Sequence, residues 1–289
     1  MKIRIGSRGS DLALWQANHV KDRLESLGHE VEIKVISTQG DRIQHLSFDK
    51  MEGKGFFTKE IEAALLTKEI DLAVHSHKDL ETTSPEGLII AAVSERENPA
   101  ELLLIRKEAV DKEQPWNLKR NAVVGTSSAR RKAQLMSHRN DVQIKDLRGN
   151  VPTRIQKLRD GNYDAIMLAL AGVSRLKIDL SEFHAEELSP FEFIPAPAQG
   201  VLGLQIRDGE DDLRKAVAAL NNAEVQQLIT IERSVLKLLE GGCQLPLGVF
   251  AENESKVHVA FAHNWENGAI YTTFEDSNPE SMVALLKEM

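Results

Sequence analysis

Apolar and polar residues alternate along the first hundred positions in a rhythm that predicts strands and helices in turn. Residues 2–5 and 31–35 show the two-residue alternation of half-buried strands. Between Ser10 and Gly28, apolar residues recur every three or four positions, which is typical of one buried helix face. Three further elements follow by the same criteria, a helix over 58–68 and strands over 71–75 and 88–93. This order predicts a mostly parallel sheet covered by helices on both faces.

A second α/β unit lies between two connectors, 94–99 and 195–200. Its expected elements are strands near 102–106, 122–125, 142–146 and 164–168, and helices near 128–138, 152–160 and 169–176. The second connector, Pro-Ala-Pro-Ala-Gln-Gly, is stiff, and one more strand follows it over 201–206. If that strand returns to the first sheet, the chain forms two lobes around a hinged cleft.

The end of the chain has a different pattern, which predicts a small α+β domain. An amphipathic helix near 223–239 is followed by strands near 256–262 and 268–274 and a short closing helix. We therefore expect three domains. Their limits are 1–98 with 195–218 for domain 1, 99–194 for domain 2 and 219–289 for domain 3.

Composition narrows the class of protein. The chain has 289 residues with 42% hydrophobic and 28% charged, which excludes a disordered or fibrous protein. Its net charge of −8 argues against general binding of nucleic acid or membrane surfaces. One cysteine excludes a disulfide framework and a multi-cysteine metal site. The first residues lack a signal-peptide pattern and no apolar run suits a membrane span, so we expect a cytoplasmic protein.

The most informative stretch runs from Val124 to Arg131, Val-Gly-Thr-Ser-Ser-Ala-Arg-Arg. A strand is expected to end there, Gly125 to allow a tight turn, and hydroxyl residues to begin a helix. Free backbone N–H groups and the helix dipole make such a place an anion site. Taken alone, the stretch is equally well an ordinary N-cap followed by solvated charges.

Further arginines recur at equivalent places, after expected strands or in the helices that follow them. They are Arg8 in the first unit and Arg148, Arg154 and Arg175 in the second. In parallel α/β folds, ligands collect beyond the carboxyl ends of the strands. Several guanidinium groups converging there suit a substrate that carries many carboxylates. We therefore expect a basic cleft within an acidic protein.

The stretch from Asp71 to Asp79 is an expected buried strand that becomes polar at its carboxyl end. Asp79 is a candidate general acid/base or charge-stabilising carboxylate if this end faces the cleft. The alternative is a salt bridge with Lys78 or a turn cap. His75 and His77 share a strand face and form, with Asp79, a weak candidate for a metal site, since no second ligand cluster accompanies them.

The single cysteine, Cys243, lies in the sequence Gly-Gly-Cys-Gln-Leu-Pro after an expected helix. A lone cysteine is usually a small buried apolar residue. A loop thiol between glycines and a proline also suits covalent attachment or nucleophilic work. From spacing alone, the two interpretations are even.

Taken together, these segments resemble the hydroxymethylbilane synthase family, also called porphobilinogen deaminases. The matching motifs cover nearly the whole chain and lie at 6–16, 53–60, 73–79, 124–131, 147–151, 163–166, 199–200 and 241–244. The resemblance implies two lobes like those of a type II periplasmic binding protein around a cleft, followed by the small α+β domain. It also implies a dipyrromethane cofactor, made from two porphobilinogen units and held by Cys243 through a thioether.

The implied activity is the head-to-tail condensation of four porphobilinogen molecules onto that cofactor. Each condensation releases ammonia, and hydrolysis then releases linear hydroxymethylbilane. No metal, nucleotide, nucleic acid or membrane is implied. The chain would work as a monomer and pass its product to uroporphyrinogen-III synthase.

The resemblance also implies roles for individual residues. Asp79 would be catalytic, holding pyrrole N–H groups and stabilising positive charge. The cofactor would contact Cys243, Lys78, Ser127, Ser128, Arg130, Arg131, Arg148 and Gly149. The substrate would contact Arg8, Ser10, Phe57, Thr126, Asn150, Arg154, Arg175 and Gln199.

The sequence departs from the family pattern at two places. The family usually has Met where His77 stands and Val-Pro where Leu80 and Glu81 stand. Residues 98–101 are Asn-Pro-Ala-Glu, where Asp-Pro-Arg-Asp is usual. These changes border the candidate catalytic carboxylate and the expected hinge.

Two rival functions use the same features. A non-enzymatic anion-binding protein of the two-lobed receptor type would need neither Cys243 nor Asp79, and such receptors normally carry an export signal. A degenerate relative would bind pyrroles without turning them over. An assay with porphobilinogen separates that relative from an active enzyme.

Overall fold

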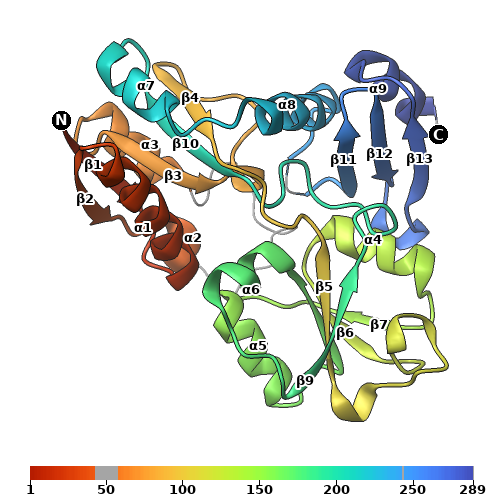
Figure 1. Ribbon diagram of the computed structural model, residues 1–289. Coiled ribbons are helices and arrows are strands. Elements are labelled where there is room, and N and C mark those ends of the chain that lie inside the picture. The colour runs from red at the N-terminus through yellow and green to blue at the C-terminus, as the bar shows by residue number, and fades with distance from the viewer. Residues whose placement is uncertain (43–57, 243, 289) are drawn as a thin grey trace. The chain divides into compact units, whose positions relative to one another are not determined.

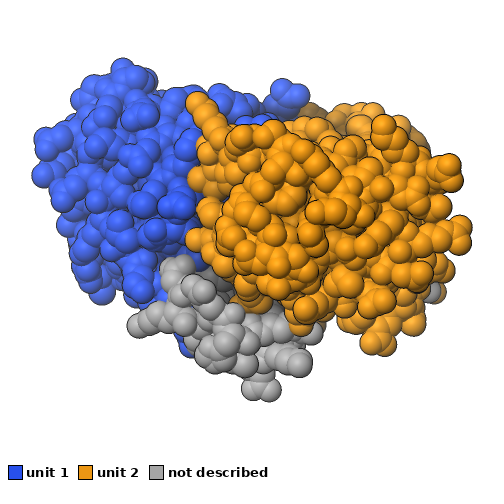
Figure 2. All heavy atoms as spheres, turned by 90° about the horizontal axis from the view of Figure 1, so that it is seen from below, with its two compact units in different colours: residues 1–44, 53–97, 198–230 blue, residues 45–52, 98–197, 231–289 orange. Residues whose placement is uncertain are grey.

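The computed structural model describes residues 1–42, 58–242 and 244–288, and the described residues form three β-sheets (Figure 1). They group into two compact units (Figure 2). Among the described residues, unit 1 comprises 1–42, 58–97 and 198–230, and unit 2 comprises 98–197, 231–242 and 244–288. Residues 219–230 thus group with unit 1 and the rest of the chain's end with unit 2. The division into three domains stays a prediction.

The sheet of unit 1 has five strands in the order β2-β1-β3-β10-β4. They are β1 (Lys2–Ser7), β2 (Glu30–Val35), β3 (Leu72–Ser76), β4 (Leu88–Val93) and β10 (Leu202–Arg207). Strands β1, β2 and β3 are parallel, and β10 runs antiparallel between β3 and β4. The late strand therefore returns to the first sheet, as the connectors predict. Four of its five strands run in one direction.

Helices cover both faces of this sheet because side chains alternate along its strands. The helices of unit 1 are α1 (Asp11–Ser26), α2 (Gln39–Arg42), α3 (Lys59–Leu66) and α7 (Asp211–Ala218). Leu72 and Val74 of β3 belong to the core that includes α1, whereas Ala73 between them belongs to the core that includes α3. The sequence pattern did not predict α7, whose eight residues bury two apolar side chains, Leu213 and Val217.

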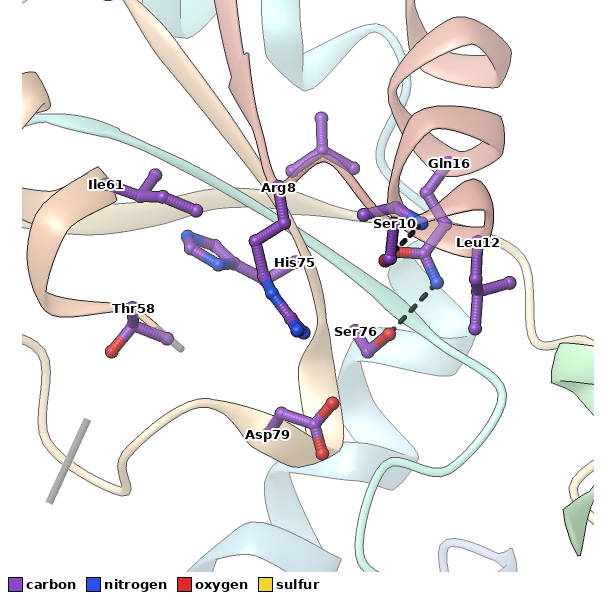
Figure 3. Close-up of a pocket in the computed structure, with 11 residues that line it drawn as sticks. Arg8, Ser10, Leu12, Gln16, Thr58, Ile61, His75, Ser76 and Asp79 are labelled. Atoms are coloured by element: carbon purple, nitrogen blue, oxygen red, sulfur yellow. Dashed lines mark hydrogen bonds between the residues drawn. The ribbon is translucent and has the colours of Figure 1, made fainter. Parts of the chain in front are cut away.

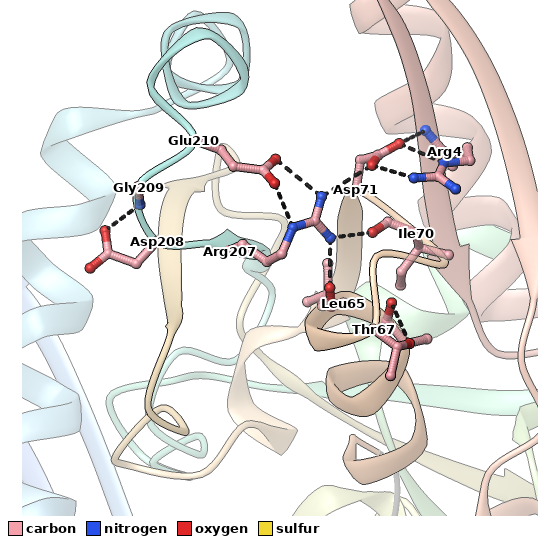
Figure 4. A network of polar contacts seen from close by, with 10 residues as sticks. Arg4, Leu65, Thr67, Ile70, Asp71, Arg207, Asp208, Gly209 and Glu210 are labelled. Atoms are coloured by element: carbon pink, nitrogen blue, oxygen red, sulfur yellow. Dashed lines mark hydrogen bonds and ion pairs between the residues drawn. The ribbon is translucent and has the colours of Figure 1, made fainter.

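A network of polar side chains lies at the end of this sheet where β3 begins (Figure 4). The Arg207 guanidinium donates to the carbonyls of Leu65 and Ile70 and to the carboxylates of Asp71 and Glu210. Asp71 also accepts two side-chain hydrogen bonds from Arg4, at 2.9 and 2.8 Å. The network joins β1, β10 and the end of α3 to one carboxylate.

The two segments that leave and return to unit 1 lie side by side. The Glu97 N–H donates to the Gly200 carbonyl at 3.1 Å, and Arg96 Nε donates to the Gln199 carbonyl at 3.0 Å. Gly200 has φ +88°, and a Cβ there would collide with the Glu97 carbonyl oxygen. This position therefore requires glycine for both its backbone conformation and the close approach.

The first sheet of unit 2 repeats the strand order of unit 1, as β7-β6-β8-β5-β9. Its strands are β5 (Glu101–Arg106), β6 (Val123–Gly125), β7 (Gln143–Lys145), β8 (Ala165–Ala169) and β9 (Phe183–Leu188), and its helices are α4 (Ala129–His138), α5 (Val151–Arg159) and α6 (Leu170–Leu176). The reversed strand is β5, between β8 and β9. The sequence pattern missed β9, an edge strand that alternates weakly. Both sheets confirm the predicted α/β class.

The small α+β part has an antiparallel sheet in the order β11-β12-β13. Its strands are β11 (Leu247–Asn253), β12 (Lys256–Phe261) and β13 (Ile270–Phe274), with α8 (Ala223–Leu238) before them and α9 (Pro279–Glu288) after. Short 3-10 turns lie at η2 (His77–Asp79), η3 (Lys107–Ala109), η4 (Pro115–Asn117) and η5 (Trp265–Asn267).

The small sheet packs on helix α4 of the same unit. Ser137 Oγ donates to the Ala269 carbonyl at 2.8 Å, and Lys132 Nζ lies 5.2 Å from the Trp265 ring centroid. Gln134 pairs with both backbone groups of Ile194. One face of α4 is therefore fixed by the small sheet, and its first turn lies at the end of β6.

Candidate active site

A pocket in unit 1 lies between the end of β3 and the first turns of α1 and α3 (Figure 3). It brings together three predicted site residues, Arg8, Ser10 and Asp79. The remaining residues around it are Leu12, Ala13, Gln16, Thr58, Ile61, Val74, His75 and Ser76. The pocket thus combines a guanidinium, hydroxyls, an imidazole and a carboxylate.

Local structure explains how each group reaches the pocket. Ser10 caps α1 by accepting a hydrogen bond from the Ala13 N–H, and Gln16 Nε2 donates to Ser76 Oγ at 2.9 Å. Gln16 is a buried polar residue beside the apolar face of α1. The sequence did not identify it as a site residue, although a glutamine next to an apolar helix face was a signal that could have done so. The bond ties helix α1 to the end of β3.

Asp79 ends the short turn η2, which begins directly after β3, and its side chain is exposed. Arg8 extends toward it in Figure 3. Asp79 makes no ion pair with a described residue, and Lys78 Nζ instead donates to Gln199 Oε1 at 3.0 Å. The structure therefore does not have the alternative salt bridge between Lys78 and Asp79.

His75 is buried on the wall of the same pocket. One of its ring nitrogens, Nε2, lies 2.9 Å from Gln205 Oε1, and Gln205 Nε2 donates to Glu62 Oε1 at 3.2 Å. Burial lowers the pKa of His75 to about 4, against a weaker opposing effect of Gln205. The imidazole is therefore neutral near pH 7.

In unit 2, the first turn of α4 carries two arginines that share one carboxylate. Arg130 Nη2 lies 2.5 Å from Glu101 Oε1, and Arg131 Nη2 lies 2.7 Å from Glu101 Oε2. All three side chains are buried, and that of Glu101 is 0% exposed. Burial lowers the pKa of Arg130, and the charge of Glu101 opposes this. Among the described residues, this trio therefore has one more positive than negative charge.

The loop before α4 is fixed by its hydroxyls. Ser127 Oγ donates to the Leu147 carbonyl and accepts from the Leu147 N–H, at 3.1 and 3.0 Å. Thr126 Oγ1 accepts from the Ser128 N–H, and Ser128 caps α4. The prediction that Gly125 allows a tight turn is wrong. Its φ is not positive, and a Cβ there would lie 2.8 Å from the Tyr163 ring, so packing requires the glycine.

The hydrogen bonds between Ser127 and Leu147 hold the next predicted site residues, which begin at Arg148, at the same edge of the sheet. Gly149 has φ +115°, and Asn150 caps α5 by accepting from the Thr153 N–H. Arg154 Nε donates to the Gly149 carbonyl at 2.8 Å. Arg148 precedes this turn and is half-buried, and Arg175 is buried in α6.

Two predicted site residues, Phe57 and Cys243, lie outside the described residues. Gln199 is fully buried beside the returning segment of unit 1. In the described part of the chain, no group of three or more His, Cys, Asp or Glu side chains could hold a metal ion. No helix among the described residues is long and apolar enough to span a membrane.

Two family models match this chain. Residues 3–215 match the model described as "Porphobilinogen deaminase, dipyromethane cofactor binding domain". The chain belongs to the porphobilinogen deaminase family. Residues 226–268 match the C-terminal domain model of the porphobilinogen deaminases. The first model includes both the pocket around Asp79 and the trio around Glu101.

Individual relatives agree with the family models. A porphobilinogen deaminase of Sulfurimonas denitrificans is 49% identical over 253 residues, which cover 86% of this chain and 79% of that protein. One of a Bacillus cereus strain is 42% identical over 287 residues, covering 97% and 91%. Among solved structures, a Salmonella typhimurium periplasmic binding protein with high arginine specificity covers 79% of this chain and 93% of its own, at TM-score 0.42 and 12% identity.

Proposed function

We propose that this porphobilinogen deaminase family member is a hydroxymethylbilane synthase. It would join four porphobilinogen molecules head to tail on a dipyrromethane attached to Cys243, release one ammonia per condensation, and free the product by hydrolysis. The observation that carries the proposal is the buried trio in which Arg130 and Arg131 share Glu101. Its excess positive charge suits a ligand rich in carboxylates.

The residues of unit 2 fit the dipyrromethane. Within the residues that the structure describes, the trio carries two positive charges against one negative charge, so it favours binding of an anion. Arg131 Nε is also a buried N–H group that has no acceptor among the described residues. The residues of unit 2 that would hold the cofactor are Ser127, Ser128, Arg130, Arg131, Arg148 and Gly149, with Cys243 as the point of attachment. Lys78 of unit 1 would also contact it. When bound, it supplies the pyrrole α-carbon to which the first substrate is joined.

The pocket of unit 1 would hold the reacting porphobilinogen. Arg8 and the Ser10 hydroxyl can donate hydrogen bonds to its carboxylates, and the exposed Asp79 carboxylate can accept from its pyrrole N–H. When ammonia leaves the aminomethyl carbon, positive charge develops on the ring. A fixed carboxylate stabilises that charge, and this electrostatic role is the one we assign to Asp79.

The other substrate contacts extend the same chemistry. Thr126, Asn150, Arg154 and Arg175 would hold carboxylates of the growing chain, with Phe57 and Gln199 completing the set. We also propose that the protein is a cytoplasmic monomer whose product passes to uroporphyrinogen-III synthase, as family membership suggests. Sedimentation velocity would measure the oligomeric state and so test whether the protein is a monomer.

Replacement of Asp79 tests the mechanism. Asp79→Asn keeps the shape but removes the charge, so single-turnover chain elongation should slow on the order of 100-fold. Asp79→Glu keeps the charge and should retain more activity. Asp208→Asn, an exposed acid of unit 1 outside the pocket, is the matched control and should elongate normally. Elongation at the wild-type rate by Asp79→Asn would make Asp79 structural.

A further inference from the structure

The mechanism above gives no role to the imidazole of His75, which lines the pocket. Strand register places it beside Gln205, because His75 pairs with Gly203 and Gln205 pairs with Ala73 across β3 and β10. The two side chains are therefore diagonal neighbours on one face of the sheet. Gln205 in turn donates a hydrogen bond to Glu62 of helix α3.

This chain of contacts fixes which nitrogen of His75 carries its proton. The Gln205 amide donates from its NH2 group to Glu62 Oε1, so it turns its oxygen to His75. The oxygen accepts a hydrogen bond from Nε2–H. In the neutral ring, Nδ1 is then an unprotonated acceptor. It makes no hydrogen bond with a described residue, and the imidazole lines the pocket.

We propose that His75 Nδ1 accepts a hydrogen bond from an N–H group of the bound porphobilinogen, with Gln205 and Glu62 as positioning residues. The proposal rests on the proposed function. Porphobilinogen has two kinds of N–H donor, its pyrrole nitrogen and its aminomethyl group. The lone pair of an unprotonated nitrogen repels carboxylates. His75 would therefore bind an N–H group of the substrate, whereas Arg8 and Ser10 would bind its acid groups.

Two substitutions separate this role from a structural one. Asn places its amide where Nδ1 lies but loses the bond to Gln205. Gln reaches Gln205 but leaves the Nδ1 position empty. On the cofactor-loaded protein, we expect His75→Gln to raise the KM for porphobilinogen and the Kd of a bound pyrrole roughly five- to tenfold. His75→Asn should stay within about twofold of wild type.

Calorimetric titration with a pyrrole that bears the acetate and propionate but lacks the aminomethyl group identifies the donor. If the affinity loss of His75→Gln persists with this analogue, the pyrrole N–H is the donor and is shared between His75 and Asp79. If the loss appears with porphobilinogen alone, the aminomethyl group is the donor. His184→Gln, a half-buried histidine of unit 2, is the control and should bind like wild type.

The opposite order of effects would overturn the inference. A purely structural ring predicts that His75→Asn is the weaker binder, with a lowered Tm, and that His75→Gln is close to wild type. Equal behaviour of the two variants would overturn it as well. Failure of the wild-type protein to bind or turn over porphobilinogen would instead defeat the proposed function.

Discussion

Glu101→Gln is the substitution with the largest predicted effect on unit 2. The carboxylate is 0% exposed and forms ion pairs with both Arg130 and Arg131. The neutral amide would leave two buried guanidinium groups close together with no opposite charge between them. The variant therefore removes the partner of two buried charges at once.

The expected loss in the free energy of unfolding is about 3–5 kcal/mol, the usual cost of removing one partner from a buried ion pair. The ion pair between Lys132 and Asp146 is the matched comparison, because its carboxylate is 43% exposed. Asp146→Asn should cost less than about 1 kcal/mol. Glu101→Asp keeps the charge and should recover part of the loss.

Urea unfolding followed by tryptophan fluorescence measures this difference. In a Trp15→Phe background, the remaining tryptophans, Trp116 and Trp265, both report on unit 2. A Cys243→Ala background would exclude stabilisation by an attached cofactor. A loss below about 1 kcal/mol for Glu101→Gln would refute the argument that a buried carboxylate holds the arginines.

Two further predictions concern unit 1. Burial alone would raise the pKa of Asp71, but hydrogen bonds from Arg4 and Arg207 outweigh it and lower the pKa. The stability from this carboxylate is therefore present above its unfolded pKa and lost as the pH falls below about 4, so Asp71→Asn should flatten acid unfolding curves in that range. Gly200→Ala should lower stability by more than about 2 kcal/mol in thermal unfolding, whereas Gly209→Ala, also at positive φ but with open space around it, should cost about 1. Equal costs would show that the approach of Gly200 to the neighbouring backbone is unimportant.

Much of the fold could be predicted because most elements have a strong local pattern. Helix α1 has a long apolar face, and the buried run of β3 is followed at once by polar residues. Elements with weak local patterns were missed. Strand β9 is an edge strand of mixed polarity, β11 has a glycine among its apolar residues and ends in Glu252 and Asn253, and α7 buries only two apolar side chains.

Residues of the candidate site could be predicted where their location depends only on their position after a strand. Arg8 and Asp79 each follow a strand, and the structure brings both to one pocket. Glu101 and Gln205 were not predictable, because their partners lie about 30 and 130 residues away in sequence. From the sequence alone, a charged residue at the start of an apolar strand, such as Glu101, is expected to be solvated. Only the tertiary structure shows that two arginines lie against it.

Intact-mass spectrometry tests the central claim, that this chain builds a pyrrole polymer on Cys243. The purified protein should be heavier than its polypeptide by two pyrrole units, and porphobilinogen should add further units one at a time. Cys243→Ala should show neither mass change nor turnover. A wild-type protein that releases hydroxymethylbilane at the bare polypeptide mass would contradict the covalent cofactor, and one that neither gains mass nor consumes porphobilinogen would contradict the proposed function.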